Sequence, residues 1–147
     1  MSAALVEDVR DYWGFTGISP EEIVAISPFG HLIVRESGGR FWYLDPELRT
    51  LESVAEDEAA LTRYMTQPDV REIWEATLLV EQASALLGPP LPGRCFSLKP
   101  MALLAGDYAS QDFWHPTISE LIRFSGSVAE QTWDLPEGAR YQIKLVD

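Results

Sequence analysis

The side chains in this 147-residue chain that could do chemistry are two histidines, one cysteine and many carboxylates. His31 and His115 lie far apart in the sequence, and Cys95 stands alone. A zinc site of the common kind needs several His or Cys ligands at compatible spacing. A nucleophilic cysteine needs a neighbouring base and an electropositive setting. The sequence shows neither arrangement, so we predict structural or surface roles for the histidines and a small apolar role for Cys95.

The 23 Asp and Glu residues are so abundant that a catalytic pair of the glycosidase type could be drawn almost anywhere. That abundance removes the specificity of the signal. The Gly38-Gly39 pair lies between two β-rich runs, whereas a phosphate-binding loop lies between a strand and a helix. We therefore predict no catalytic residue, no metal site and no cofactor. A small hydrolase or ligand-binding domain that uses the neighbourhood of Cys95 or His115 is the alternative.

Aromatic side chains cluster in an irregular stretch near residue 110, at Tyr108, Phe113 and Trp114. The simpler interpretation is that these rings fill the core beneath a long loop. The alternative is that Tyr108 and Trp114 are exposed and anchor a partner, because Tyr and Trp are enriched at binding hot spots. We keep both residues as candidate contacts.

Negative charge is concentrated in the middle of the chain. The net charge is −12, and residues 45–81 hold ten acids but three bases. Any single acid is best explained as a helix cap or part of a solvated face. A surface of one sign repels nucleic acid and anionic membranes, and it speeds association with a basic protein. Our candidate contact surface is therefore acidic and helical: Asp57, Glu58, Glu72 and Glu75.

The strands that must hold these residues are organised around residues 29–44. Two β-rich runs, 31–35 and 40–44, flank a Ser-Gly-Gly turn, which is a strong hairpin signal. A third strand is predicted at 50–54 and another at 94–98, with a terminal strand at 139–146. Residues 20–26 begin either with one or two helical turns from Pro20 or with an ordered turn that leads into a strand at 23–26.

Helices are predicted from apolar spacing and capping residues at 3–13, after Asp57, from Asp69 to about Leu87, and from Thr117 or Ser119. One broad apolar face is expected on the helix over 69–87, formed by Val70, Ile73, Trp74, Thr77, Val80 and Leu87. The predicted fold class is α+β. A mainly antiparallel sheet with a central hairpin packs against three to four helices in a single domain spanning 1–147.

The expected compartment is the cytoplasm. The single cysteine excludes an internal disulfide. The first residues are acidic where a signal peptide would carry Lys or Arg. No apolar run approaches the roughly 20 residues that a membrane helix needs.

Several phrases resemble, in their order and spacing, the C-terminal domain of type VI secretion immunity proteins, which follows a GAD-like domain in longer members. The phrases are Ser27-Pro28-Phe29-Gly30-His31-Leu32, Phe41-Trp42-Tyr43-Leu44-Asp45-Pro46, Gly93-Arg94-Cys95-Phe96 with Lys99-Pro100, Gly106-Asp107-Tyr108, and Asp134-Leu135-Pro136-Glu137-Gly138. The resemblance runs from about Pro20 to the end, and residues 1–18 carry no matching phrase.

The resemblance implies a cytoplasmic immunity protein that binds a cognate toxin, often a nuclease, and blocks its active site. It implies no catalytic residue, because the matched positions are turn glycines, prolines and core aromatics. It does not say which residues bind the toxin. A basic toxin is the expected partner, since an acidic inhibitor can compete for a cleft that attracts DNA or RNA. A regulatory or scaffold module that binds an unrelated protein is the other open interpretation.

Overall fold

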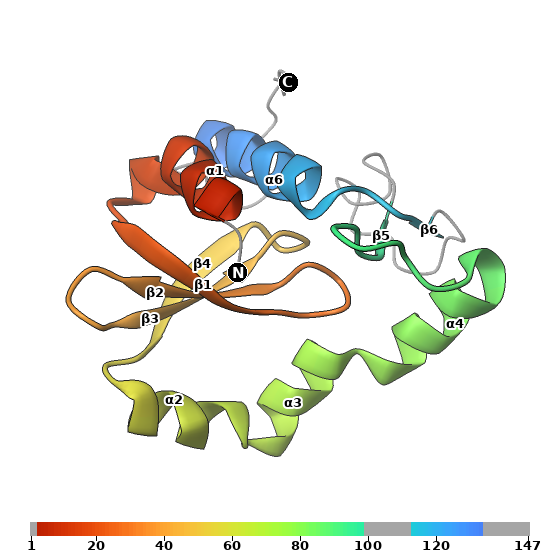
Figure 1. Cartoon of the computed structure of the whole chain (residues 1–147), viewed down its shortest axis with the longest axis horizontal. Helices are drawn as coiled ribbons and strands as arrows, with labels where there is room; N and C mark the ends of the chain where they lie inside the picture. Colours follow the sequence, from red (N-terminus) through yellow and green to blue (C-terminus); the bar gives the residue numbers. More distant parts are fainter. Residues whose placement is uncertain (1–2, 99–112, 134–147) are drawn as a thin grey trace.

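A four-stranded antiparallel sheet forms the middle layer of the computed structural model, which describes residues 3–98 and 113–133 (Figure 1). The strands are β1 (Pro20–Ile26), β2 (Leu32–Glu36), β3 (Phe41–Asp45) and β4 (Thr50–Ala55), in that order across the sheet. Helices α1 (Ala3–Trp13) and α6 (Ile118–Thr132) cover one face, and α2 (Glu58–Met65) and α3 (Pro68–Glu75) cover the other. The predicted α+β class with an antiparallel sheet is confirmed.

The remaining elements lie beside the sheet. A 3-10 turn, η1 (Gly14–Thr16), follows α1, and α4 (Thr77–Leu87) leads away from the sheet toward a small ribbon formed by β5 (Ser97–Leu98) and β6 (Phe113–Trp114) (Figure 1). Phe113 and Trp114, expected in an irregular stretch, thus pair as a short strand. The predicted strand at 94–98 shortens to β5, because Arg94 bridges Thr117 instead. Tyr108 and the predicted strand at 139–146 lie outside the described residues.

The central hairpin forms as predicted from β2 and β3, with Leu32 paired to Leu44 and Val34 to Trp42. Gly38 and Gly39 in its turn have φ values of 101° and 96°, which L-residues with a Cβ adopt only at a cost. Period-2 alternation then sends neighbouring side chains to opposite faces. Leu32, Val34 and Leu44 pack in the cluster shared with α1 and α6. Ile33, Phe41 and Tyr43 pack in the cluster shared with α2 and α3.

The first and last described helices are joined by polar as well as apolar contacts. The Trp13 indole N–H donates to the Ile122 carbonyl at 3.2 Å. The buried Asp8 carboxylate accepts from the Ser119 hydroxyl at 2.6 Å and from Arg123 Nε at 2.9 Å. A capping box at Thr117 and Glu120 begins α6, in agreement with the predicted start. These contacts fix the helical layer over one face of the sheet.

Of the two open interpretations of residues 20–26, the structure adopts a strand that already begins at Pro20. Pro20 pairs with Glu36 at the edge of the sheet. A proline is tolerated there because an edge strand does not need every backbone N–H as a donor. Register shifts interrupt the pairing on either side of Glu22 and Ile23.

The single helix predicted over 69–87 is wrong, because the chain breaks at Ala76 into α3 and α4. Ala76 has φ 45° and ψ 44°, the left-handed region. The break leaves backbone hydrogen bonds in place, since Ala76 donates to Glu72 and accepts from Val80, both at 2.9 Å. The two halves pack on different apolar clusters. In α3, the Trp74 ring makes a T-shaped contact with the Tyr43 ring, with 5.7 Å between the ring centroids. In α4, Ala83 packs in a separate cluster formed by Phe29, Phe96, Leu98 and Phe113.

The predicted apolar face is divided by this break. Val70 is buried, but Ile73 and Leu87 are 57% and 42% exposed. Thr77 is also exposed. A continuous helix would have kept these side chains on one face. The change in direction at Ala76 therefore leaves large apolar side chains in contact with solvent.

Gly126→Ala is expected to destabilise the protein by about 1–3 kcal/mol, because an added methyl group would overpack the crossing of α1 and α6. A Cβ at Gly126 would lie 2.5 Å from the Tyr12 carbonyl oxygen and 2.9 Å from Trp13 Cδ1. This strain exceeds the gain of about 1 kcal/mol in helix propensity. Urea unfolding measures the change. Gly14→Ala is the control, with nothing within 4 Å of the added Cβ; equal stabilities for the two variants would contradict the close crossing.

Ala76→Gly is expected to stabilise the protein by about 0.5–1 kcal/mol, because it relieves a left-handed strain of about 1–2 kcal/mol at an entropy cost of about 0.5–1 kcal/mol. The matched control is Ala85→Gly, at an exposed position inside α4, which is expected to destabilise by about 0.5–1 kcal/mol. Thermal or urea unfolding gives both signs. Destabilisation by both substitutions would indicate a continuous helix through Ala76.

Candidate functional site

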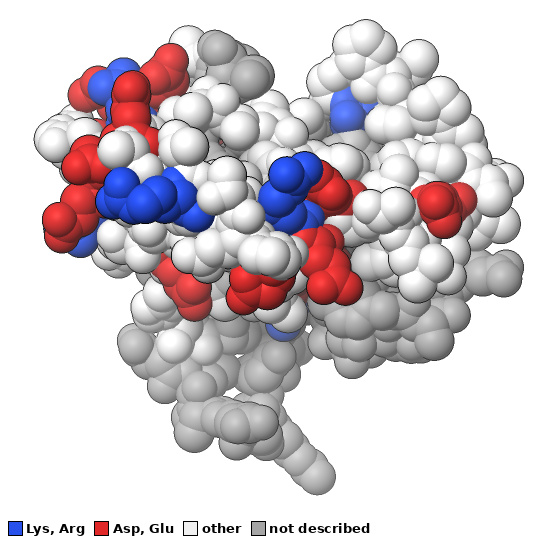
Figure 2. All heavy atoms as spheres, turned by 90° about the horizontal axis from the view of Figure 1, so that it is seen from below, with Lys and Arg blue, Asp and Glu red and all other residues white. Residues whose placement is uncertain are grey.

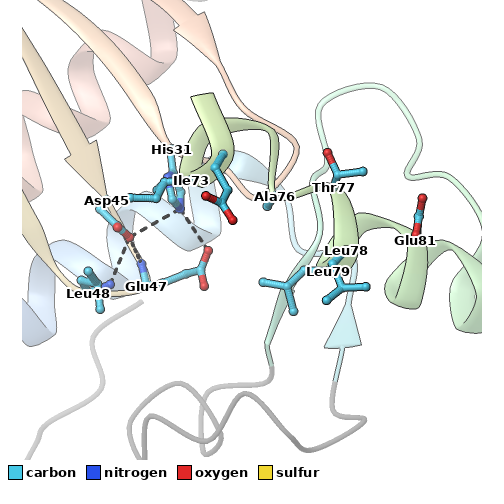
Figure 3. A pocket seen from close by; sticks show the side chains of 11 residues that line it. His31, Asp45, Glu47, Leu48, Ile73, Ala76, Thr77, Leu78, Leu79 and Glu81 are labelled. Atoms are coloured by element: carbon cyan, nitrogen blue, oxygen red, sulfur yellow. Dashed lines mark hydrogen bonds and ion pairs between the residues drawn. The ribbon is translucent and has the colours of Figure 1, made fainter. Parts of the chain in front are cut away.

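An open cleft of about 640 Å³ lies between the β3–β4 loop and the junction of α3 with α4 (Figure 3). Its floor is formed from the sheet and its walls from the two helices. The lining residues are His31, Asp45, Glu47, Leu48, Glu72, Ile73, Ala76, Thr77, Leu78, Leu79 and Glu81. The break at Ala76 creates the cleft, because it turns α4 away from the sheet while α3 stays packed on it.

The floor of the cleft is a buried cluster of His31, Asp45 and Glu47. Hairpin register builds it: Leu32 pairs with Leu44, so His31, one residue before β2, lies opposite Asp45 at the end of β3. His31 Nε2 is 3.0 Å from Glu47 Oε1 and 3.5 Å from Asp45 Oδ1. The dashed lines in Figure 3 mark these contacts.

Tyr43 holds the other side of the His31 ring, with its hydroxyl oxygen 2.6 Å from Nδ1. Burial raises the pKa of the Tyr43 hydroxyl well above its usual value, and the negative charge of Asp45 adds to the effect. Tyr43 therefore keeps its proton throughout the physiological range. With both ring nitrogens in hydrogen-bond contact, the orientation of the His31 imidazole is fixed.

Asp45 also shapes the loop that carries Glu47. Asp45 Oδ1 accepts from the backbone N–H groups of Glu47 at 2.9 Å and Leu48 at 3.0 Å. This is the arrangement by which an Asp side chain closes a turn on its own backbone. The Arg49 guanidinium donates to the Glu47 carbonyl at 3.2 Å. The loop therefore presents the Glu47 carboxylate toward His31 in a defined position.

The cleft is acidic and its rim is apolar. Among the described residues, four carboxylates line it and no Lys or Arg does. Within the described ranges, Glu72 and Glu81 form neither an ion pair nor a side-chain hydrogen bond. Leu48, Ile73 and Leu78 at the rim are 61%, 57% and 68% exposed. Figure 2, seen from the side of α2 and α3, shows acidic side chains spread over this face with some basic ones between them.

The structure separates the candidate contacts named from the sequence. Glu72 lines the cleft. Asp57 caps α2 by accepting from the Ala60 N–H at 2.8 Å, and Glu58 is exposed in the first turn of that helix. Glu75 pairs with Arg71 at 2.8 Å. Trp114 is half-buried and its indole N–H donates to the Leu98 carbonyl at 3.0 Å.

The spacing of His and Cys residues does not group His31 with Asp45 and Glu47, because two of the three ligands are carboxylates across a hairpin. The signal in the sequence is the hairpin itself: pairing the two predicted strands places residue 31 opposite residue 45. The three side chains each offer one donor atom, and these atoms lie within 4.8 Å of one another, close enough to share a metal ion.

Cys95 is 3% exposed, and burial raises the pKa of its thiol to about 12, with the charge of Glu47 adding to the shift. A nucleophilic cysteine needs the opposite shift. His115 Nε2 is buried without a hydrogen-bond partner in the described part of the chain, and its ring packs 5.3 Å from Phe96. Among the described residues, neither Cys95 nor His115 has a partner arranged for nucleophilic catalysis.

Comparison of the chain with models of protein families and with curated protein sequences finds no match. Within residues 3–98 and 113–133, no helix combines the length and the apolar content needed to cross a bilayer.

The Cys95 thiol is expected to resist Ellman's reagent in the folded protein at pH 8, because its raised pKa keeps it protonated and its burial blocks access. Unfolding in urea at the same pH should release one reactive thiol per chain, as the single cysteine requires. Absorbance of the released chromophore measures both states. Fast labelling of the folded protein would contradict the buried placement and revive Cys95 as a reactive group.

Proposed function

We propose that this chain is an immunity protein that neutralises a basic toxin by binding it in equal amounts at the acid-lined cleft. The observation that carries the proposal is the cleft itself, whose described lining residues include four carboxylates and no Lys or Arg. The resemblance to type VI secretion immunity domains, stated above, supplies the class of partner. A toxin that acts on nucleic acid carries a basic active site, and an acidic surface can compete for it.

Charge favours this partner over the other macromolecules that the cell offers. The net charge of −12 repels nucleic acid and anionic membranes. The same charge attracts a basic protein from a distance and raises the association rate. The acids Glu72 and Glu81 line the cleft, and neither forms an ion pair with a described residue, so both are suited to pairing with a partner.

The apolar rim supplies the part of the binding energy that charge does not. Leu48, Ile73 and Leu78 are more than half exposed around the mouth of the cleft. Large apolar side chains next to a cleft mark interaction sites when they cluster. Burial of such residues at the centre, surrounded by charged contacts, is the usual composition of a specific protein interface.

Co-purification tests the function directly. The tagged chain is recovered from its native cell, and proteins present in near-equal amount are identified by mass spectrometry. A basic protein that is toxic when expressed alone and harmless together with this chain supports the immunity function. A stoichiometric partner that is harmless alone would instead assign the chain to the regulatory or scaffold class.

Glu72→Lys is expected to weaken partner binding about tenfold, mainly through a slower association rate, because it reverses charge inside the cleft. Glu75→Lys is the matched control: it lies one turn away on α3, changes the net charge equally, and faces Arg71 instead of the cleft. Its effect is expected to stay within about twofold. Surface plasmon resonance against the recovered partner measures both. Equal losses would show that net charge alone matters and that the cleft is not the docking surface.

A further inference from the structure

We propose that His31, Asp45 and Glu47 bind one divalent transition-metal ion, Zn²⁺ or a close relative, at the floor of the cleft. The inference rests on the geometry of these three side chains and not on the proposed immunity function. The two proposals can therefore fail separately.

The donor set fits such an ion. One imidazole and two carboxylates combine a nitrogen ligand with two oxygen ligands, and Zn²⁺ is held by His nitrogen and by Asp or Glu oxygen in proteins. The mixture does not suit Mg²⁺ or Ca²⁺, which prefer oxygen ligands alone. Three protein ligands also leave room for water to complete the coordination shell.

The distances between the donor atoms are close to those in a zinc site: one falls within the usual range and the other is about 0.3 Å shorter than its lower limit. His31 Nε2 lies 3.0 Å from Glu47 Oε1 and 3.5 Å from Asp45 Oδ1. Ligands bonded to Zn²⁺ at about 2.0–2.2 Å in tetrahedral geometry are separated from one another by about 3.3–3.6 Å. Donor atoms that lie within 4.8 Å of one another need only small side-chain shifts to reach a common ion.

The surrounding contacts orient the donors before an ion arrives. Metal-bound histidines give the N–H of the other ring nitrogen to a fixed partner, which directs the free lone pair at the metal. When Nε2 binds a metal, the ring proton is on Nδ1, and the Tyr43 hydroxyl oxygen, 2.6 Å away, is placed to accept it. Asp45 is held by two backbone N–H groups of its own turn. Only Nε2 of the His31 ring faces the two carboxylates.

The cluster carries buried negative charge, and the cleft connects it to solvent. Two buried carboxylates share one histidine, and no Lys or Arg within residues 3–98 and 113–133 lines the cleft. A divalent cation would balance this negative charge, which is costly to bury uncompensated. The cleft opens from the cluster to solvent between the β3–β4 loop and α4, and this gives an ion a path to the site (Figure 3).

The test begins with the full chain, treated with a chelator and dialysed into metal-free buffer. Co²⁺ serves as a spectroscopic probe for the Zn²⁺ site, and Zn²⁺ binding is followed by calorimetry. We expect one ion per chain, a visible Co²⁺ absorption band that Zn²⁺ removes, and an increase in Tm with Zn²⁺ concentration, because an ion that binds only the folded state stabilises it. Absence of saturable binding by the wild-type protein overturns the proposal without any variant.

Glu47→Gln should weaken Zn²⁺ affinity at least tenfold, because the amide loses the negative charge while its oxygen can still accept from His31. Glu81→Gln is the matched control: it removes one carboxylate from the same cleft but not from the donor set. It should leave the affinity unchanged. Unchanged affinity in Glu47→Gln, or an equal loss in both variants, overturns the assignment and leaves the cluster as a hydrogen-bonded support of the hairpin.

Discussion

Every layer of this molecule depends on covering both faces of the four-stranded sheet. Alternation along β2 and β3 gives each face its own apolar set, with Leu32, Val34 and Leu44 on one and Ile33, Phe41 and Tyr43 on the other. Helices from opposite ends of the described chain, α1 and α6, cover one face, and the consecutive helices α2 and α3 cover the other. The same register that divides the faces also brings His31 to Asp45. The core and the candidate site therefore follow from one pairing of two strands.

Local signals were sufficient to predict much of the sheet and several helix ends. The Ser-Gly-Gly turn requires positive φ, and Asp57 and Thr117 cap helices with their own side chains. The break at Ala76 had no such signal, because alanine is the best helix former and no Gly or Pro marks the position. There, two separate packing surfaces, one around Tyr43 and one around Phe29, overrode the local preference.

The candidate site was less predictable than the fold because it depends on tertiary contacts that local sequence signals do not show. Glu72 was identified from charge density alone, and that argument could not separate it from Glu75, which pairs with Arg71. The His31 cluster required the strand register and the path of the β3–β4 loop together. Charge counting finds an acidic region, whereas only tertiary structure tells which acids face a cleft and which already have partners.

The joining of α1 to α6 has a consequence for how the protein is made. The Trp13 indole bonds to the carbonyl of Ile122, 109 residues later in the chain. One face of the sheet therefore cannot be closed until the last described helix has left the ribosome. Until then α1 alone can cover the apolar side chains of this face, and the part that α6 covers stays open to the cell; such surfaces on nascent chains are what chaperones bind. Closure of this face is then a late step dominated by a contact of high sequence separation, the kind that slows folding.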